Sequence, residues 1–441
     1  MIRKYEKYRD SGVEWIGAIP EGWECKRFKY VFKEHSGNGF PNDMQGNTDG
    51  TIPFYKVSDL NGVETFVSDS NNYVTNEDIN LKGWNLIPAE TILTAKIGES
   101  LRKNHRKICK SECIIDNNCL GLEPTLISSK YAYYLLKTVD FDWFVNPGAV
   151  PSISMDKLRN FILPLSKIEQ TAISLFLDRK TSEIDQLIAN KEKLIALYEE
   201  EKTAVINHAV TKGLDPKVQT KTSGIDWLGD IPEHWEVKRL KYFVSKVGSG
   251  VTPKGGASVY QLDGIPLLRS QNIHFNGLRL DDVAYISQEI HEDMKNSKVL
   301  SGDVLLNITG ASIGRCYFTD DSLSEANVNQ HVCIIRPKPA MSTKYLFYLL
   351  RSDVGQKQID IEQTGSGREG LNFESLKNFF LPVAEHSEQT TIVAHIETEC
   401  SRLDTIIDKF KKQIDLLKEY RTTLISEVVT GKIDVRDEVA A

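Results

Sequence analysis

The sequence predicts an α+β protein that is an internal tandem repeat, with two mixed α/β blocks each followed by one long helix. Three observations predict this fold class. The segment SGVEWIGAIPEGWECKRFKY, which begins at Ser11, returns as SGIDWLGDIPEHWEVKRLKY from Ser223, with 13 of the 20 positions identical. LRNFILPLSKIEQ from Leu158 likewise returns as LKNFFLPVAEHSEQ from Leu376, and a long stretch with an apolar heptad pattern follows each copy. The 441 residues also exceed what one hydrophobic core usually serves.

The two blocks, residues 1–165 and 216–382, have the pattern of mixed α and β structure. The runs TIPFYKV and AETILTAKI predict strands in the first block, and GIPLLRS, GDVLLNIT and HVCIIRP predict strands in the second. Helical patterns occur at 130–138 and 344–351. The central parts of the two blocks differ far more than their edges, so we expect one scaffold to carry two different surfaces.

Two long helices, residues 166–215 and 383–431, follow the blocks, and a short tail, residues 432–441, ends the chain. The second helix repeats apolar residues every seven positions, as a coiled-coil seam requires: Ile396, Leu403, Phe410, Leu417 and Leu424, with a second register at Cys400, Ile407, Ile414, Arg421 and Val428. The first helix keeps the seam less strictly and is interrupted by Lys191 and Lys202. We expect the two helices to pair as an antiparallel coiled coil with a pseudo-two-fold repeat.

Composition and charge restrict the class of protein. The chain is 40% apolar and 26% charged, as in ordinary globular proteins, and it has no apolar run long enough for a membrane span or a secretory signal. We therefore expect a cytoplasmic protein with reduced thiols. The net charge is −7, but the acidic excess lies mainly on the helices and the tail. The run KIGESLRKNHRKICK, residues 96–110, is basic and predicts either a phosphate-contacting segment or a solvated loop.

Catalytic motifs are not recognisable. GASIGRCY from Gly310 lacks the Lys-Ser/Thr pair of a phosphate-binding loop, and NPGAVP has Gly148 where an amino-methyltransferase signature has its second proline. Cys109, Cys113 and Cys119 lie near His105 without a CxxC pair, which favours ordinary thiols over a zinc site. We expect no catalytic, cofactor or metal site in this chain.

Together, these segments resemble the specificity subunit of type I restriction-modification enzymes. The resemblance rests on the doubled SG-x-x-W-x-G-x-IP-x-x-W segment, the LP and EQ pairs before the long helices, and GDVLLNITGASIG with ANVNQHVCIIRP, and it covers essentially the whole chain. It implies a non-catalytic subunit with two target-recognition domains, each reading half of an asymmetric bipartite site in double-stranded DNA. The helices would set the gap and dock two methyltransferase subunits. Restriction and translocase subunits would complete the enzyme, and S-adenosylmethionine, ATP and Mg would belong to these partners.

Major-groove reading needs Arg or Lys for guanine and Asn or Gln for adenine, which selects candidate DNA contacts in both blocks. In the first block the candidates are Asn38, Lys56, Ser58, Lys96, Arg102, Lys103, Asn104, Arg106 and Lys107. In the second block they are Ser249, Thr252, Lys254, Arg269, Gln271, Asn272, Ser312, Arg315, Ser366 and Arg368. A surface or turn-stabilising role stays open for each. We interpret Thr309 and Gly310 as turn residues, and Asn327, Asn329 and Gln330 as hydrogen-bonded loop residues.

Four tryptophans of the repeated segment, Trp15, Trp23, Trp227 and Trp235, stand at the same places in both halves. Aromatic rings can stack on bases. Contacts that distinguish two half-sites should not be duplicated, however. We therefore predict that these residues pack in the core and at the junction with the opposite helix.

Two other classes of protein remain as alternatives. A coiled-coil interaction scaffold would bind protein through its blocks and would have no affinity for duplex DNA. A fused nuclease or methyltransferase would need acidic metal ligands or a cofactor loop, and neither pattern is recognisable in the sequence.

Overall fold

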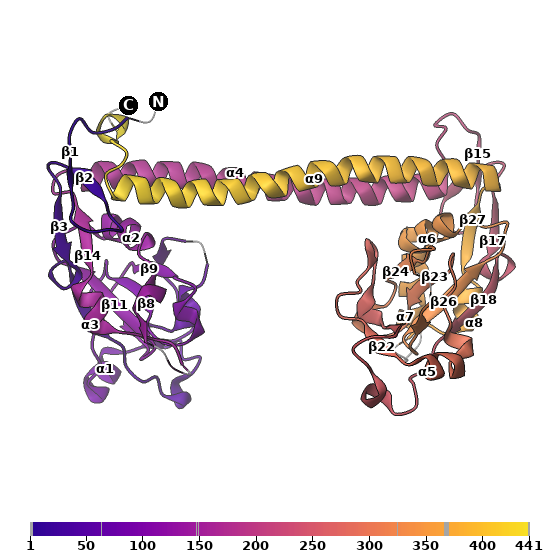
Figure 1. Ribbon diagram of the computed structural model, residues 1–441, viewed down its shortest axis with the longest axis horizontal. Helices are drawn as coiled ribbons and strands as arrows, with labels where there is room; N and C mark the ends of the chain where they lie inside the picture. The colour runs from indigo at the N-terminus through magenta and orange to yellow at the C-terminus, as the bar shows by residue number, and fades with distance from the viewer. Residues whose placement is uncertain are drawn as a thin grey trace. The chain divides into compact units, whose positions relative to one another are not determined.

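The computed structural model describes residues 3–62, 64–146, 148, 150–323, 325–365 and 370–439. The chain forms two compact units (Figure 1), in which unit 1 comprises residues 1–191 and 411–441 and unit 2 comprises residues 192–410. Each unit contains one globular block and one end of each long helix. The predicted boundaries follow the helix ends, whereas this division passes within the helices, because the helix ends share a core with the blocks.

The described residues of unit 1 form fourteen strands, three short α-helices and one end of each long helix. The strands are β1 (Tyr8–Asp10), β2 (Ala18–Pro20), β3 (Glu24–Arg27), β4 (Phe32–Ser36), β5 (Ile52–Tyr55), β6 (Phe66–Val67), β7 (Tyr73–Val74), β8 (Ile92–Ala95), β9 (Arg106–Cys109), β10 (Ile114–Ile115), β11 (Cys119–Pro124), β12 (Val145–Asn146), β13 (Ser152–Ile153) and β14 (Ile162–Leu165). The helices are α1 (Asn76–Lys82), α2 (Ser129–Lys137), α3 (Met155–Asn160) and α4 (Gln170–Lys212). The predicted strands in TIPFYKV and AETILTAKI are confirmed as β5 and β8, and the predicted short helix as α2.

The main sheet of unit 1 has the order β4-β11-β8-β9-β6, and β10-β5-β7 form a second sheet. Shorter pairs join β1 to β2, β3 to β14 and β12 to β13. The central strand β8 is buried at all four positions, as expected for a strand covered on both faces.

Unit 2 repeats this architecture, with thirteen strands in the part that the structure describes. They are β15 (Thr220–Thr222), β16 (Asp230–Pro232), β17 (Glu236–Arg239), β18 (Val244–Ser249), β19 (Ile265–Leu268), β20 (Ile273–His274), β21 (Gly277–Leu278), β22 (Ala284–Ile286), β23 (Val304–Asn307), β24 (Cys316–Phe318), β25 (Asn327–Val328), β26 (Val332–Pro337) and β27 (Phe380–Val383). The helices are α5 (Gln288–Asp293), α6 (Thr343–Arg351), α7 (Asp353–Gly365), α8 (Phe373–Lys377) and α9 (His386–Val429). The predicted strands are confirmed as β19, β23 and β26, and the predicted short helix as α6. The main sheet has the order β18-β26-β23-β24, and β22-β19-β25 form a second sheet.

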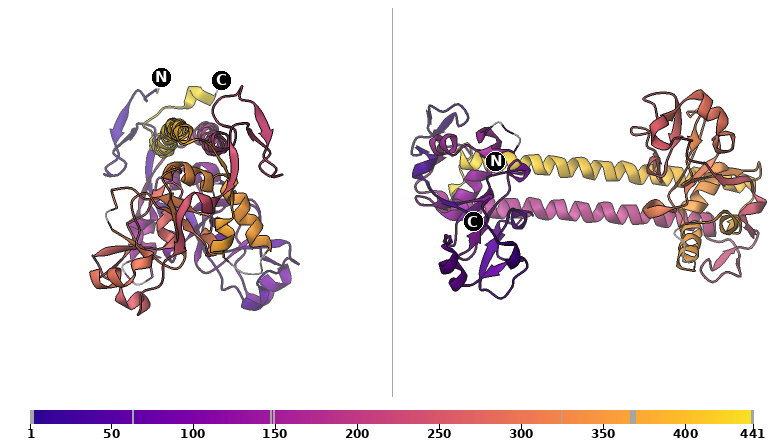
Figure 2. Two further views of the ribbon diagram at one scale, coloured as in Figure 1. Left: turned by 90° about the vertical axis from the view of Figure 1, so that its right-hand side faces the viewer. Right: turned by 90° about the horizontal axis from the view of Figure 1, so that it is seen from below.

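The helices α4 and α9 lie side by side in each unit (Figure 2). In unit 1 Arg421 forms an ion pair with Asp185 at 3.1 Å, and in unit 2 the rings of Tyr198 and Phe410 stack at 6.0 Å. Residue numbers increase along α4 from 185 to 198, whereas those of their partners on α9 decrease from 421 to 410, so the two helices pair antiparallel. The predicted seam is confirmed by its buried members, which include Ile396, Leu403, Ile407, Ile414 and Leu424. No helix in the described part of the chain combines the length and apolar character of a membrane span.

The tryptophans of the repeated segment join the blocks to the starts of the long helices. Trp23 is 2% exposed and donates its indole N–H to Glu169 Oε2 at 3.1 Å, just before α4. Trp235 is 0% exposed and donates to Glu388 Oε2 at 3.0 Å, in the first turn of α9. We call these two contacts the Trp–Glu joints. They confirm the predicted core role of Trp23 and Trp235.

The glycines that follow the long helices lie beside the same tryptophans. Gly213 and Gly431 have φ angles of +73° and +74°, the left-handed conformation that commonly ends a helix. A Cβ atom at Gly431 would lie 3.4 Å from Trp23, and one at Gly213 would lie 3.5 Å from Trp235. Each tryptophan therefore packs between the start of one long helix and the end of the other, which explains why both segments occur twice.

Candidate nucleic-acid interface

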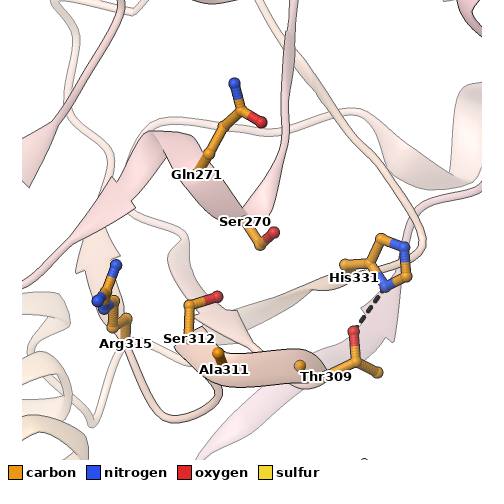
Figure 3. Close-up of a pocket in the computed structure, with 8 residues that line it drawn as sticks. Ser270, Gln271, Thr309, Ala311, Ser312, Arg315 and His331 are labelled. Atoms are coloured by element: carbon orange, nitrogen blue, oxygen red, sulfur yellow. Dashed lines mark hydrogen bonds between the residues drawn. The ribbon is translucent and has the colours of Figure 1, made fainter. Parts of the chain in front are cut away.

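A polar pocket opens on the block of unit 2 (Figure 3). Its walls come from the short 3-10 helices η8 (Ser270–Asn272) and η10 (Gly310–Ser312) and from the loop that precedes β26. The lining residues are Ser270, Gln271, Thr309, Gly310, Ala311, Ser312, Arg315 and His331. Three of the predicted DNA contacts, Gln271, Ser312 and Arg315, thus meet at one site.

Strand pairing builds this pocket from distant segments. In the antiparallel pair of β23 and β26, Asn307 lies opposite Val332, so the residues after β23 meet those before β26. The backbone N–H of Ile308 donates to His331 O at 3.0 Å and continues the pairing. Gly310 has a φ of +74°, which lets the chain turn away immediately after the strand. The predicted turn role of Gly310 is confirmed.

Asn307 lies directly beneath the lining and holds it in place. Its side chain is fully buried, and its Nδ2 donates to Ser270 O at 2.8 Å and to Ser312 Oγ at 3.1 Å. Its Oδ1 is buried without a hydrogen-bond partner among the described residues. A buried polar atom without a partner is costly, so the fold bears this cost directly beneath the pocket.

A hydrogen-bonded relay forms one wall. Thr252 Oγ1 donates to Gln330 Oε1 at 2.6 Å, and Gln330 Nε2 lies 2.9 Å from His331 Nε2. On the other side of the ring, His331 Nδ1 lies 2.6 Å from Thr309 Oγ1 (Figure 3). The relay fixes the orientation of the imidazole, so that Thr309 keeps a single position in the pocket.

Two longer side chains stand at the edge of the pocket. Arg315 is exposed, and no hydrogen bond or ion pair of its guanidinium is formed with the residues that the structure describes. Gln271 is also exposed, and its Nε2 donates to Asp282 Oδ2 at 2.8 Å. The pocket therefore offers donors from Arg315 and an acceptor from Gln271 Oε1.

The remaining candidates of unit 2 have different surroundings. Arg269 is half-buried and donates through NH2 to Asp282 O at 3.1 Å. Asn272 is 1% exposed, and its Oδ1 accepts from the Arg269 N–H at 2.9 Å, so its side chain stabilises the turn of η8. Ser249 is half-buried at the end of β18, and Lys254 is exposed nearby. Ser366 and Arg368 lie outside the described residues.

In unit 1 the candidates Lys56, Ser58, Lys96, Arg102 and Lys103 are exposed or half-buried. The ammonium group of Lys56 lies 4.3 Å from the ring centre of Phe40, and the guanidinium of Arg102 is 3.3 Å from Asp142. Lys103 is exposed and has no charged or hydrogen-bonded partner in the described ranges. Gly98 (φ +83°) follows β8 as Gly310 follows β23, which makes Lys103 the counterpart of Arg315.

Asn38, Asn104, Arg106 and Lys107 are engaged within unit 1 itself. Asn38 has a backbone bond to Ile115 O at 2.8 Å, and its Nδ2 is buried. Asn104 Oδ1 accepts from the Phe141 N–H at 2.9 Å. Arg106 is 3% exposed, and burial lowers the pKa of its guanidinium to about 10. Lys107 is 6% exposed and pairs with Glu64 at 3.0 Å.

The basic run 96–110 is therefore neither one continuous basic surface nor one solvated loop, because residues 106–109 form a buried strand. Arg106 and Lys107 form the first half of β9, a strand that lies between β8 and β6 in the main sheet. The side chains of Arg106 and Lys107 are buried because of this position in the sheet. Lys96, Arg102 and Lys103 lie before the strand, on a turn.

The lining residues Thr309 and His331 were not among the predicted DNA contacts. Both directly flank paired strands, since Thr309 follows β23 and His331 precedes β26. A prediction that GDVLLNIT pairs with HVCIIRP would have placed these two residues together. The interpretation of Asn329 as a hydrogen-bonded loop residue is confirmed, because its Oδ1 accepts from the His331 N–H at 3.1 Å. Asn327 is hydrogen-bonded as expected, through Nδ2 to Ser297 Oγ at 2.8 Å, but it begins strand β25 and does not lie in a loop.

Metal-ligating side chains do not gather in the described part of the chain: it holds no group of three or more His, Cys, Asp or Glu residues that could bind an ion. Cys109, Cys113 and Cys119 are free and buried in the core of unit 1. Burial raises the pKa of the Cys119 thiol far above its ordinary range.

Comparison with known proteins agrees with this architecture. The chain is 24% identical over 431 residues to the MjaVIII specificity subunit of a type I restriction enzyme from Methanocaldococcus jannaschii, with 95% of each chain covered. The HsdS subunit from Thermoanaerobacter tengcongensis superposes with a TM-score of 0.54 at 13% identity, covering 96% of this chain and 100% of that one. A chain from a structural study of complex assembly in the type I R-M system superposes with a TM-score of 0.64 at 14% identity, covering 94% and 99%.

The family model of the type I restriction modification DNA specificity domain matches the chain twice, over residues 20–196 and 232–416. The two matches contain most of each globular block and most of each long helix. The chain therefore belongs to the specificity-subunit family of type I restriction-modification systems, a family of DNA-sequence recognition.

Proposed function

We propose that this chain is the DNA-recognition subunit of a type I restriction-modification enzyme, and that each unit reads one half of an asymmetric, bipartite site in double-stranded DNA. Unit 1 and unit 2 then serve as the first and second target-recognition domains. In this proposal the chain performs no catalytic step and works in the cytoplasm.

One observation carries the proposal: the two units share their framework contacts but differ in their exposed loops. The Trp–Glu joints are the same in both units, with distances of 3.1 and 3.0 Å. By contrast, the turn that follows the central strand carries Lys103 in unit 1 and Arg315 in unit 2, and the relay through His331 belongs to unit 2. A duplicated framework with unlike polar loops suits a protein that recognises two unlike sequences in the same manner.

The catalytic functions would belong to partner subunits. Two methyltransferase subunits would bind S-adenosylmethionine, and restriction/translocase subunits would bind ATP and Mg. The long helices are suitable docking surfaces, because they expose large apolar side chains such as Leu187, Leu194, Leu197 and Leu416. The helices would also set the gap between the half-sites, since α4 and α9 are the segments that both units share.

The test is to co-express the full chain with the methyltransferase encoded beside it, in a host without other adenine methylation, and to map methyladenine across the genome. We expect an asymmetric motif of two half-sites separated by a fixed gap. Size-exclusion chromatography with light scattering should find two methyltransferase subunits per chain. A continuous motif contradicts the bipartite proposal. A complex that contains the methyltransferase but does not bind duplex DNA favours the interaction scaffold instead.

A further inference from the structure

The relay in unit 2 sets the direction of the hydrogen bond that Thr309 can make. Gln330 Nε2 is an amide nitrogen and can only donate, so His331 Nε2 must accept at their 2.9 Å contact. In the neutral imidazole, Nδ1 then carries the proton and donates to Thr309 Oγ1 at 2.6 Å. The hydroxyl hydrogen of Thr309 is consequently free to donate to a ligand in the pocket.

Arg315 adds further donors to the same pocket. Its guanidinium carries N–H groups in a fork, has no acceptor atom, and is exposed at the pocket without a partner among the described residues. A ligand that satisfies the Arg315 fork must present two acceptors close together. The major-groove edge of guanine presents N7 and O6, and an arginine fork on this pair is the commonest specific contact to DNA.

Gln271 distinguishes a base pair from a phosphate. Because its Nε2 is engaged by Asp282 at 2.8 Å, the free atom of the amide is the acceptor Oε1. The N4 amino group of the cytosine paired with guanine is a donor in the same groove, whereas a backbone phosphate has no donor to offer. The donors of Arg315 and Thr309 and the acceptor of Gln271 line one pocket and suit the donor and acceptor pattern of a G·C pair.

Asn307 provides independent support for a ligand at this place. It is fully buried under the pocket and bonds two lining residues, Ser270 and Ser312, yet its Oδ1 has no partner among the described residues. Such a cost is tolerated where a rigid floor positions recognition groups for a ligand.

We infer that the pocket of unit 2 reads one G·C base pair of the second half-site from the major groove, with Arg315 and Thr309 directed at guanine and Gln271 at cytosine. This inference rests on the proposed function and adds the identity of one base pair and the residues that select it.

The test uses the full complex of this chain with its methyltransferase. Methyladenine is mapped for the unaltered chain, for Arg315→Lys, Arg315→Met and Thr309→Val, and for the matched variant Lys103→Met in unit 1. Binding to duplexes that carry each of the four base pairs at every half-site position then measures discrimination. Thermal melting shows which variants are folded, and the conservative Thr309→Val change provides a second measurement if an Arg315 variant is unstable.

We expect Arg315→Lys and Arg315→Met to reduce discrimination at a single G·C position about 10- to 100-fold, in one half-site only, because one bidentate contact is lost. Thr309→Val should weaken discrimination at the same position, and Lys103→Met should act on the other half-site. A uniform loss of affinity with an unchanged motif would identify a phosphate contact and overturn the inference. An unchanged motif in folded variants, or relaxation at an A·T position, would also overturn it. Failure of the proposed function is distinct, because the unaltered complex would then show no bipartite motif.

Discussion

The two units of this chain are alike where the blocks meet the long helices and different where the blocks face solvent. At the joints, Trp23 with Glu169 and Trp235 with Glu388 repeat one geometry, although the second partner of the carboxylate is the Tyr5 hydroxyl in unit 1 (2.6 Å) and His234 in unit 2 (2.9 Å). Away from the joints, unit 2 has the relay through His331 and the exposed Arg315. The comparison teaches that packing constrains the duplicated segments, while the loops between them are free to diverge.

A second comparison concerns the last residue of the equivalent short helices, Lys137 of α2 and Arg351 of α6. Arg351 donates to Phe275 O at 3.0 Å and lies over the rings of Phe275 and Phe347. Lys137 lies over the Tyr133 ring, and burial together with the charges of Arg106, Arg421 and Lys107 lowers its pKa to about 8. The same position is therefore stabilising in one unit and electrostatically unfavourable in the other.

Loss of a joint tryptophan should have the largest effect on stability. Trp23→Ala and Trp235→Ala each remove a buried ring between two helix ends and should lower the free energy of unfolding by about 3–5 kcal/mol. Urea denaturation of the full chain measures the change, with Trp→Phe at each site as the control that keeps most of the packing. Equal, small losses for Ala and Phe variants would show that the joints are not core contacts.

Removal of the acidic partner in the helix pair should have a smaller effect, and it should differ between the units. The Lys202 side chain is 6% exposed and pairs with Asp404, whereas the Arg421 side chain is 27% exposed and pairs with Asp185. Asp404→Ala should cost about 1–2 kcal/mol, because it weakens the pairing of a buried cation, and Asp185→Ala should cost less than 1 kcal/mol. A larger cost for Asp185→Ala, measured by thermal melting, would contradict this order.

Replacement of Lys137 should stabilise the chain slightly and in a pH-dependent manner. Below about pH 8 the lysine is charged in both the folded and the unfolded chain, so the folded chain bears the full cost of burying this charge near other cations. Between pH 8 and its ordinary pKa of 10.5 the unfolded chain binds more protons, so the stability of the unaltered chain rises with pH. Lys137→Met should therefore gain on the order of 1 kcal/mol at pH 7 and lose this advantage as the pH approaches 10.5.

Differential melting curves from pH 6 to 10 provide the measurement, with Arg351→Met as the matched control. The Arg351 variant should be destabilised, because it loses a hydrogen bond and ring contacts without relieving repulsion. A stability difference for Lys137→Met that does not change with pH would refute the electrostatic explanation.

Local patterns predicted the strands β5, β8, β19, β23 and β26, the short helices, the helical seam and the packing of the joint tryptophans. These features depend on periodicity within one segment or on direct repetition. The candidate site was harder to predict, because it depends on pairing between distant strands. Arg106 and Lys107 were expected at the surface, but β9 lies inside the main sheet, and Thr309 and His331 meet through the register of β23 with β26.

The most direct test of the central claim, one framework that holds two different readers at a fixed separation, is to lengthen both long helices together. Seven residues inserted at 191–192 in α4 and at 410–411 in α9 preserve the heptad seam and add about 10 Å of helix, close to the rise of about three base pairs. Mapping of methyladenine with this variant should give both original half-sites with a longer gap. Unchanged spacing in a folded, active complex, or a change in either half-site, would contradict the account.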